Sequence, residues 1–170
     1  MNTDTSHTQV RRRTLIIMRV NEKAEDFYED ALELGTIAAK AFKQAQEQRN
    51  SHKQNRHRAQ MTGLENIAET TLKFTDVLDY IKKQIARLDL WSFKYEGKPG
   101  GGYKAFGESL KSYIEGRLKV EADQICNDLH IGDTRIEDKR DRQLVYLQLI
   151  RQFVRQIVVQ YEYKTDGARQ

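Results

Sequence analysis

The clearest helical pattern in the sequence lies in residues 63–90, GLENIAETTLKFTDVLDYIKKQIARLDL. Apolar and small residues recur there at spacings of three and four, which places them on one face of a helix. Thr62 and Glu65 match a capping box at the start of this segment. The pattern therefore predicts one long amphipathic helix over 63–90 that buries a stripe of residues: Leu64, Ile67, Ala68, Thr71, Leu72, Thr75, Leu78, Ile81, Ile85 and Leu88.

Three further segments show the same periodicity. An alanine-rich stripe predicts a helix over 22–48, with Asn21 as its N-cap and an acidic first turn. Apolar residues at helical spacing predict a third helix over 103–129 and a fourth over 134–163. The predicted fold class is therefore all-α, a helical bundle of about four long helices with a short N-terminal element.

The composition argues against an all-β fold and for a single domain. The chain has 170 residues but only one proline and ten glycines, whereas a sandwich or barrel needs a turn signal every 8–12 residues or so. The apolar, partly β-branched run at 14–20 is compatible with one short strand or with a first helical turn. We expect a tail and this short element over 1–20, one helical bundle domain over 21–163, and a tail over 164–170.

Cysteine content and hydropathy indicate a soluble, cytoplasmic protein. Cys126 is the only cysteine, so no disulfide can form within the chain and a reducing compartment is expected. The longest apolar run, residues 15–18, is far shorter than the roughly 18 residues of a membrane span. The N-terminus also lacks the apolar stretch of a secretory signal.

No sequence motif for catalysis or metal binding is present. None of the four histidines lies in an HExxH motif, and none follows a glutamate by three residues. Residues 97–102, GKPGGG, depart from the phosphate-loop pattern because a proline follows the lysine. We therefore expect a protein that is not an enzyme, with no metal and no cofactor.

The break around 91–103 leaves two pairs of interpretations open. Its glycines lead into a predicted helix N-terminus whose free amides can bind one phosphate, although a flexible linker is the favoured interpretation. The aromatic side chains of this segment can stack on nucleic-acid bases or fill the end of the bundle, and we favour filling. These aromatic residues are Trp91, Phe93, Tyr95 and Tyr103.

Charge is strongly segregated along a chain whose net charge is +4. Six acidic residues and one lysine lie in 20–34, whereas six basic residues and one glutamate lie in 34–64. Residues 49–60, RNSHKQNRHRAQ, predict a hydrophilic loop or a solvated helix extension, and such basic clusters attract polyanions by releasing counterions. The candidate nucleic-acid-binding residues are Arg49, Lys53, Arg56, Arg58, Lys82, Lys83, Arg151 and Arg155.

The helical register of 22–163, the basic stretch 49–60 and the basic last helix resemble the small subunits of CRISPR effector complexes. The resemblance covers nearly the whole chain but involves no signature motif, and the N-terminal segment RRRTLIIMRV departs from it. It implies a non-catalytic small subunit of an antiviral-defence ribonucleoprotein complex. Such a subunit assembles with further copies of itself and other subunits, and it holds guide RNA, target DNA or a displaced DNA strand through backbone contacts.

The alternative prediction is a helical protein–protein adaptor that does not bind nucleic acid. In that case the basic stretch docks on an acidic protein surface. The acidic start of the 22–48 helix favours a solvated face, but in a nucleic-acid-binding subunit it would meet a basic face of the next subunit or of a large partner.

Overall fold

The computed structural model of this chain describes residues 3–87, 89–97 and 99–166, with side chains from residue 9 onward. Its described part is predominantly helical, which confirms the all-α class. The helices are more numerous than the four that the sequence predicts, and most of them are shorter than the predicted ones. The helices and strands in chain order are α1 (Thr3–Asp26), α2 (Tyr28–Glu47), α3 (Ser51–Thr70), α4 (Phe74–Ile85), the 3-10 turn η1 (Leu90–Ser92), β1 (Lys94–Glu96), β2 (Tyr103–Ala105), α5 (Phe106–Tyr113), the π-helical segment η2 (Ile114–Leu118), α6 (Lys119–Asp128) and α7 (Ile136–Asp166).

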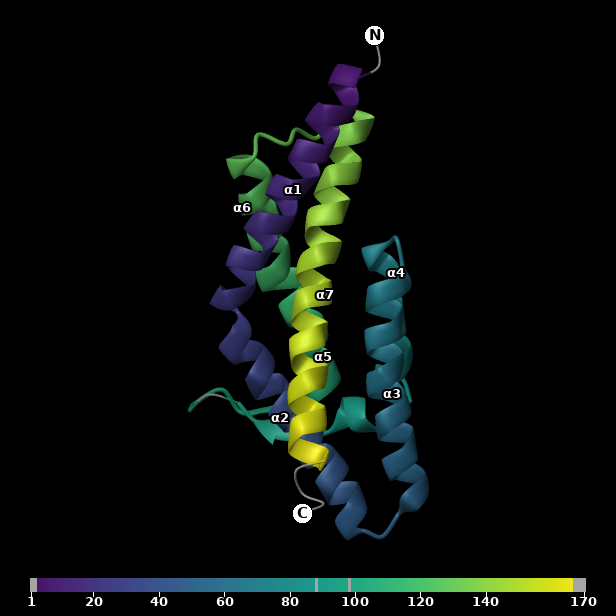
Figure 1. The fold of residues 1–170 in the computed structure, drawn as a ribbon. Helices are drawn as coiled ribbons and strands as arrows, with labels where there is room; N and C mark the ends of the chain where they lie inside the picture. The colour runs from purple at the N-terminus through teal and green to yellow at the C-terminus, as the bar shows by residue number, and fades with distance from the viewer. Residues whose placement is uncertain (1–2, 88, 98, 167–170) are drawn as a thin grey trace.

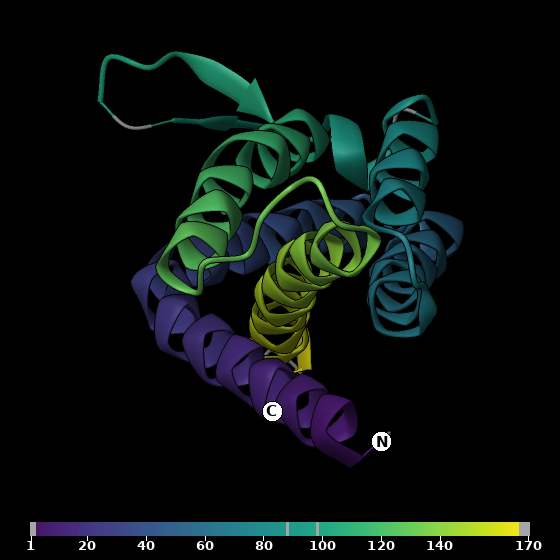
Figure 2. The ribbon, with the colours of Figure 1, turned by 90° about the horizontal axis from the view of Figure 1, so that it is seen from above.

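Helix α7 is the centre of the fold. It runs through the length of the molecule, with α1 and α2 on one side and the α3–α4 pair on the other (Figure 1). Seen from above, the remaining helices surround α7 (Figure 2). Phe153 of α7 is fully buried, with its ring edge-on to Phe27 at 5.6 Å and stacked on Tyr113 at 4.4 Å. The hydrophobic core therefore forms around this helix.

The N-terminal segment is helical in its described residues, so of the two structures left open for 14–20 the helical one forms and the short strand does not. Helix α1 runs into the predicted 22–48 helix and is separated from α2 only at Phe27, whose φ of −114° and ψ of 9° interrupt the helix. Phe27 is fully buried against α7, and the bend at this residue lets α1 and α2 lie along different parts of α7. Contact with the core thus sets the bend.

The helix predicted over 63–90 is replaced by two helices, and the first of them begins earlier. Helix α3 begins at Ser51, where the Asn50 side chain accepts a hydrogen bond from the Lys53 amide at 3.1 Å, so the Thr62 capping box is wrong. Helix α3 ends at Thr70. The backbone of Thr71 is extended, and its hydroxyl accepts a hydrogen bond from the Lys73 amide at 3.1 Å before α4 begins. Leu72, predicted to be buried, is therefore 86% exposed. Leu88, also predicted to be buried, lies outside the described residues.

Between α4 and α5 the glycine-rich segment forms the end of a short β-hairpin. Strands β1 and β2 pair antiparallel with Tyr95 opposite Lys104, and the hairpin projects from the bundle (Figure 2). Lys98 lies outside the described residues. The predicted 103–129 helix begins at Phe106 and is interrupted by η2. The last helix begins at Ile136, two residues after its predicted start at 134, and continues to Asp166.

Candidate nucleic-acid interface

The basic stretch 49–60 forms the turn after α2 and the first half of α3. Arg49 has a positive φ of 51° in this turn, and its side chain is exposed. Lys53 and Arg56 are three residues apart and exposed, so they share a solvent-facing side of α3. The solvated helix extension, one of the two structures predicted for this stretch, is the one that forms.

Arg58 lies on a different side of α3 from Arg56. Its guanidinium is 3.0 Å from the Asp166 carboxylate near the end of α7 and sits above the Phe42 ring at 5.1 Å from the centroid. Residues two apart on a helix point in nearly opposite directions. The structure therefore separates two residues that the sequence placed in one cluster.

Arg151 is engaged at the end of α3. Its Nε donates to the Ala68 carbonyl at 2.8 Å and an Nη atom donates to the Thr71 carbonyl at 2.7 Å. These carbonyls belong to the helix C-terminus, which leaves unpaired acceptors and favours a positive charge. The guanidinium is thus already bound to backbone carbonyls of the chain itself, and its contact with nucleic acid stays a prediction.

Arg155 and Lys82 each have an acidic neighbour at the surface. An Nη atom of Arg155 lies 2.8 Å from the Glu69 carboxylate, and the Lys82 ammonium lies 3.5 Å from that of Asp79. Exposed ion pairs of this kind contribute little and exchange readily with solvent. Both cations remain at the surface, but their charges are partly compensated within the chain.

A groove between α3 and α4 gathers three other cations. Its volume is about 760 Å³, and it is open to solvent. Arg56 lies on the α3 side of the groove, 3.5 Å from the Asp89 carboxylate. Lys83 lies on α4, and Arg87 lies in the turn that follows α4. In the described part of the chain Lys83 and Arg87 have no acidic ion-pair partner. The other lining residues are Ala59, Gln60, Tyr80 and Gln84; we call this surface the α3–α4 groove.

Tyr80 holds the two walls of the groove together. Its hydroxyl donates to the Gln60 carbonyl at 2.9 Å, and its ring meets the buried Trp91 edge-on at 6.3 Å. A Cβ at position 63 would lie 2.3 Å from the Tyr80 hydroxyl oxygen, so Gly63 lets this side chain reach α3. Burial raises the pKa of Tyr80, and the nearby Arg87 opposes that rise. The phenol is therefore neutral at physiological pH.

Two glutamines beneath the groove carry unpaired polar atoms. Gln60 and Gln84 are 4% and 5% exposed. Both polar atoms of the Gln60 carboxamide, and Oε1 of Gln84, have no hydrogen-bond partner among the described residues. Native proteins rarely leave buried polar groups unpaired.

A buried contact between His57 and Asp89 anchors the first half of α3. His57 Nε2 lies 2.8 Å from an Asp89 carboxylate oxygen, and both side chains are almost inaccessible. Among the described residues, His57 Nδ1 has no hydrogen-bond partner, so no serine or cysteine completes a catalytic triad. The pair fastens α3 to the segment that follows α4.

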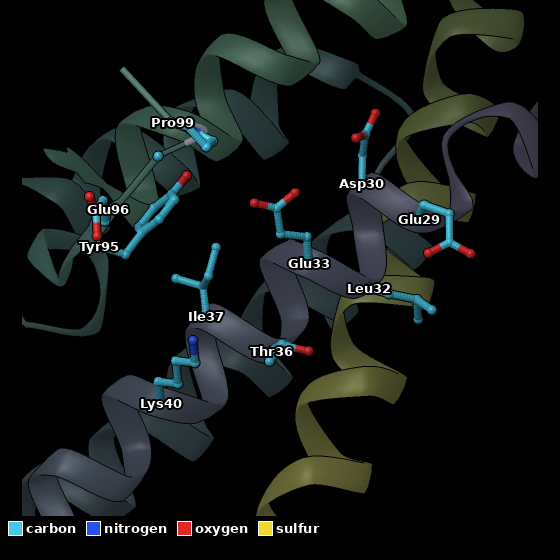
Figure 3. A pocket seen from close by; sticks show the side chains of 11 residues that line it. Glu29, Asp30, Leu32, Glu33, Thr36, Ile37, Lys40, Tyr95, Glu96 and Pro99 are labelled. Carbon is cyan, nitrogen blue, oxygen red and sulfur yellow. The ribbon is translucent and has the colours of Figure 1, made fainter. Parts of the chain in front are cut away.

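The opposite side of the molecule is acidic. A hollow of about 770 Å³ lies between α2 and the β-hairpin, and Figure 3 shows Glu33 on the side facing Tyr95. Asp30 accepts a hydrogen bond from the Tyr113 hydroxyl at 2.6 Å, which together with burial raises the pKa of that tyrosine. The described residues contain no cluster of potential metal ligands.

The aromatic residues around the hairpin have different surroundings. Trp91 is fully buried and packs on Phe106 with ring centroids 5.5 Å apart. Tyr103 is 77% exposed, while Phe93 and Tyr95 are half-buried. The prediction that these rings fill the bundle end is confirmed for Trp91 and wrong for Tyr103.

Sequence reasoning placed the basic stretch on the right part of the chain but did not identify the groove. Tyr80 and Gln84 were missing from the predicted site. The spacing of Tyr80, Lys83 and Gln84 at three and four residues is a signal that they share one side of α4, and Arg87 follows in the turn after this helix.

Comparison with protein-family models finds no match, and comparisons with curated proteins and with solved structures also find none. Within the described residues, no helix has both the length and the apolar character needed to cross a membrane. The argument for a function therefore rests on the site itself.

Proposed function

We propose that this protein is a non-catalytic nucleic-acid-binding subunit that holds a phosphate backbone on the α3–α4 groove and the adjacent basic turn. The observation that carries the proposal is the convergence of Arg56, Lys83 and Arg87 on one open groove. Arg49 and Lys53 extend this positive surface toward α2. Such a surface neutralises phosphates and releases their counterions, which drives binding of any sequence.

The wider context of this activity follows from the sequence resemblance alone. A small subunit of a CRISPR effector complex has this size, this helical character and a backbone-binding role. We include that membership in the proposal, with guide RNA, target DNA or the displaced strand as the nucleic acid.

The direct test is a titration of labelled single-stranded RNA, single-stranded DNA and duplex DNA with the purified chain over a range of salt concentrations. We expect the logarithm of the affinity to fall by about 0.7 per contacted phosphate for each unit of log salt on single strands. Absence of binding at low salt would refute the proposal.

Charge reversal locates the surface. The double variant Arg56→Glu/Lys83→Glu should lose most of the binding and show a shallower salt dependence. The matched control Lys139→Glu/Arg140→Glu changes the charge equally on two exposed residues at the start of α7. Equal losses in both variants would show a general effect of net charge and would contradict the assignment to the groove.

A second candidate function, the protein–protein adaptor, is favoured by the exposed side of α1. Ile17 and Met18 are 52% and 54% exposed, Leu15 is 46% exposed, and Arg11 and Arg19 flank them. An apolar surface with a basic rim is typical of an interface with an acidic partner. Partner proteins that stay bound to the unmodified protein after nuclease treatment, but do not bind the variant Ile17→Asp/Met18→Asp, would support the adaptor function.

A further inference from the structure

The α3–α4 groove combines charged and neutral recognition groups. Lys83 and Arg87 at its edge suit an anion, and each is free of an acidic partner within the described residues. Beneath them, the Oε1 atoms of Gln60 and Gln84 are hydrogen-bond acceptors without a donor there. A backbone phosphodiester satisfies the cations, but it has no hydrogen to donate to a carboxamide oxygen.

The ligand that satisfies the whole groove must therefore carry both a negative charge and neutral N–H or O–H donors. A nucleotide has both, in its phosphate and in its base or ribose. Gln60 has an unpaired NH₂ group as well as an unpaired oxygen, and a carboxamide with both free matches the donor and acceptor edge of a base. The groove volume of about 760 Å³ lies within the roughly 300–1,000 Å³ of small-molecule sites.

We infer that the α3–α4 groove takes one unstacked nucleotide of a single strand, with its phosphate on Lys83 and Arg87 and its base on the carboxamides of Gln60 and Gln84. This inference rests on the proposed function and adds a base contact to backbone binding. The ring of Tyr80, fixed by its hydrogen bond to α3, forms a wall for the base. A base within a duplex cannot enter, because it is stacked and paired.

The inference predicts two separable effects in binding to single-stranded homopolymers. The variants Gln60→Met and Gln84→Met remove the carboxamide with little change in volume. They should reduce the preference among homopolymers by at least about fivefold and leave the salt dependence unchanged. The variant Lys83→Ala/Arg87→Ala should keep the preference but reduce the salt slope by about 1.4, or 0.7 for each lost contact.

Stability measurements separate loss of binding from loss of folding. Replacing an unpaired buried amide by an apolar side chain of similar size relieves a desolvation penalty, so both Met variants should melt at or above the temperature of the unmodified protein. The exposed Gln143 of α7 offers the matched control Gln143→Met, which should change neither stability nor homopolymer preference.

Each outcome has one meaning. If the unmodified protein binds no nucleic acid, the proposed function itself fails. If it binds, but the two Met variants keep the full homopolymer preference, the carboxamides hold only ordered water or neighbouring side chains and the base contact is refuted. Equal affinity for duplex, or displacement of the strand by equimolar mononucleotide, also overturns the assignment to a nucleotide within a single strand.

Discussion

The α2–α7 contact and the α3–α4 pair are packed in opposite ways. Where α2 meets α7 the buried residues of α2 are apolar or small, and a Cβ at Gly35 would lie 2.6 Å from the Ile157 carbonyl oxygen. Between α3 and α4 the buried layer includes Gln60 and Gln84, whose polar atoms lack partners among the described residues. The first region gains stability from close packing, whereas the second keeps groups whose burial opposes stability. Regions of the second kind are expected at binding sites.

The largest expected effect is in the α7 core. Phe153→Ala removes a fully buried ring that packs on Phe27 and Tyr113. We expect a loss of about 3–5 kcal/mol in the free energy of unfolding because a cavity replaces the ring. Urea denaturation measures this value. If Phe153→Ala costs no more than Gln84→Met, the proposed contrast between the two regions is wrong.

The close approach of α2 to α7 gives the next effect. Gly35→Ala places a methyl group against the backbone of Ile157 and the side chain of Gln160, at 2.6 and 2.7 Å. Because backbone must move, we expect a loss of about 1–3 kcal/mol. Gly116→Ala is the control, since nothing lies within 4 Å of the added carbon. Similar melting temperatures for both variants would show that α2 and α7 are not in tight contact.

Arg151 and Arg155 of α7 should differ in how much each contributes to stability through its contact with α3. Arg151→Ala leaves the carbonyls of Ala68 and Thr71 without their charged donor, so we expect a loss of about 2 kcal/mol. Arg155→Ala removes only an exposed pair with Glu69 and should cost less than about 1 kcal/mol. Thermal denaturation of the two single variants compares them directly, and the reverse order would contradict the structural role of Arg151.

The smallest expected effect is a stabilising one. Partial burial, together with repulsion from Glu162 and Glu69, raises the pKa of Glu65 on α3, with opposition from Arg155. Because the pKa of Glu65 is higher in the folded than in the unfolded protein, the free energy of unfolding falls as the pH rises from the unfolded-state pKa through the folded-state pKa. Glu65→Gln should therefore raise stability by about 0.5 kcal/mol at pH 7. The gain should vanish near pH 4, where the carboxyl is protonated, and a gain that persists there would exclude an electrostatic cause.

Much of the helix content was predictable, but the interruptions were not. The spacing of apolar residues gave helices around 22–48 and 134–163, since each has one apolar face. The break at Thr71 has no Gly or Pro to indicate it. It is stabilised by Arg151, which lies 80 residues further along the chain.

The candidate site was predicted only in part for the same reason. Lys53 and Arg56 could be predicted because they belong to a basic run that is visible in the sequence, and both lie on the exposed side of α3. The pairing of this side with Lys83 and Arg87 depends on the reversal of direction between α3 and α4. A single long helix over 63–90 would have placed these residues far apart.

The sequence by itself determined the all-α class and the segregation of charge, because helical periodicity and net charge are local properties of the chain. The tertiary structure alone decided where the helices bend and which cations remain free. Bends are stabilised by contacts between distant residues, as at Phe27 against Phe153. A cation is free only if no carboxylate or carbonyl reaches it, which is why, among the described residues, Lys83 remains available and Arg151 does not.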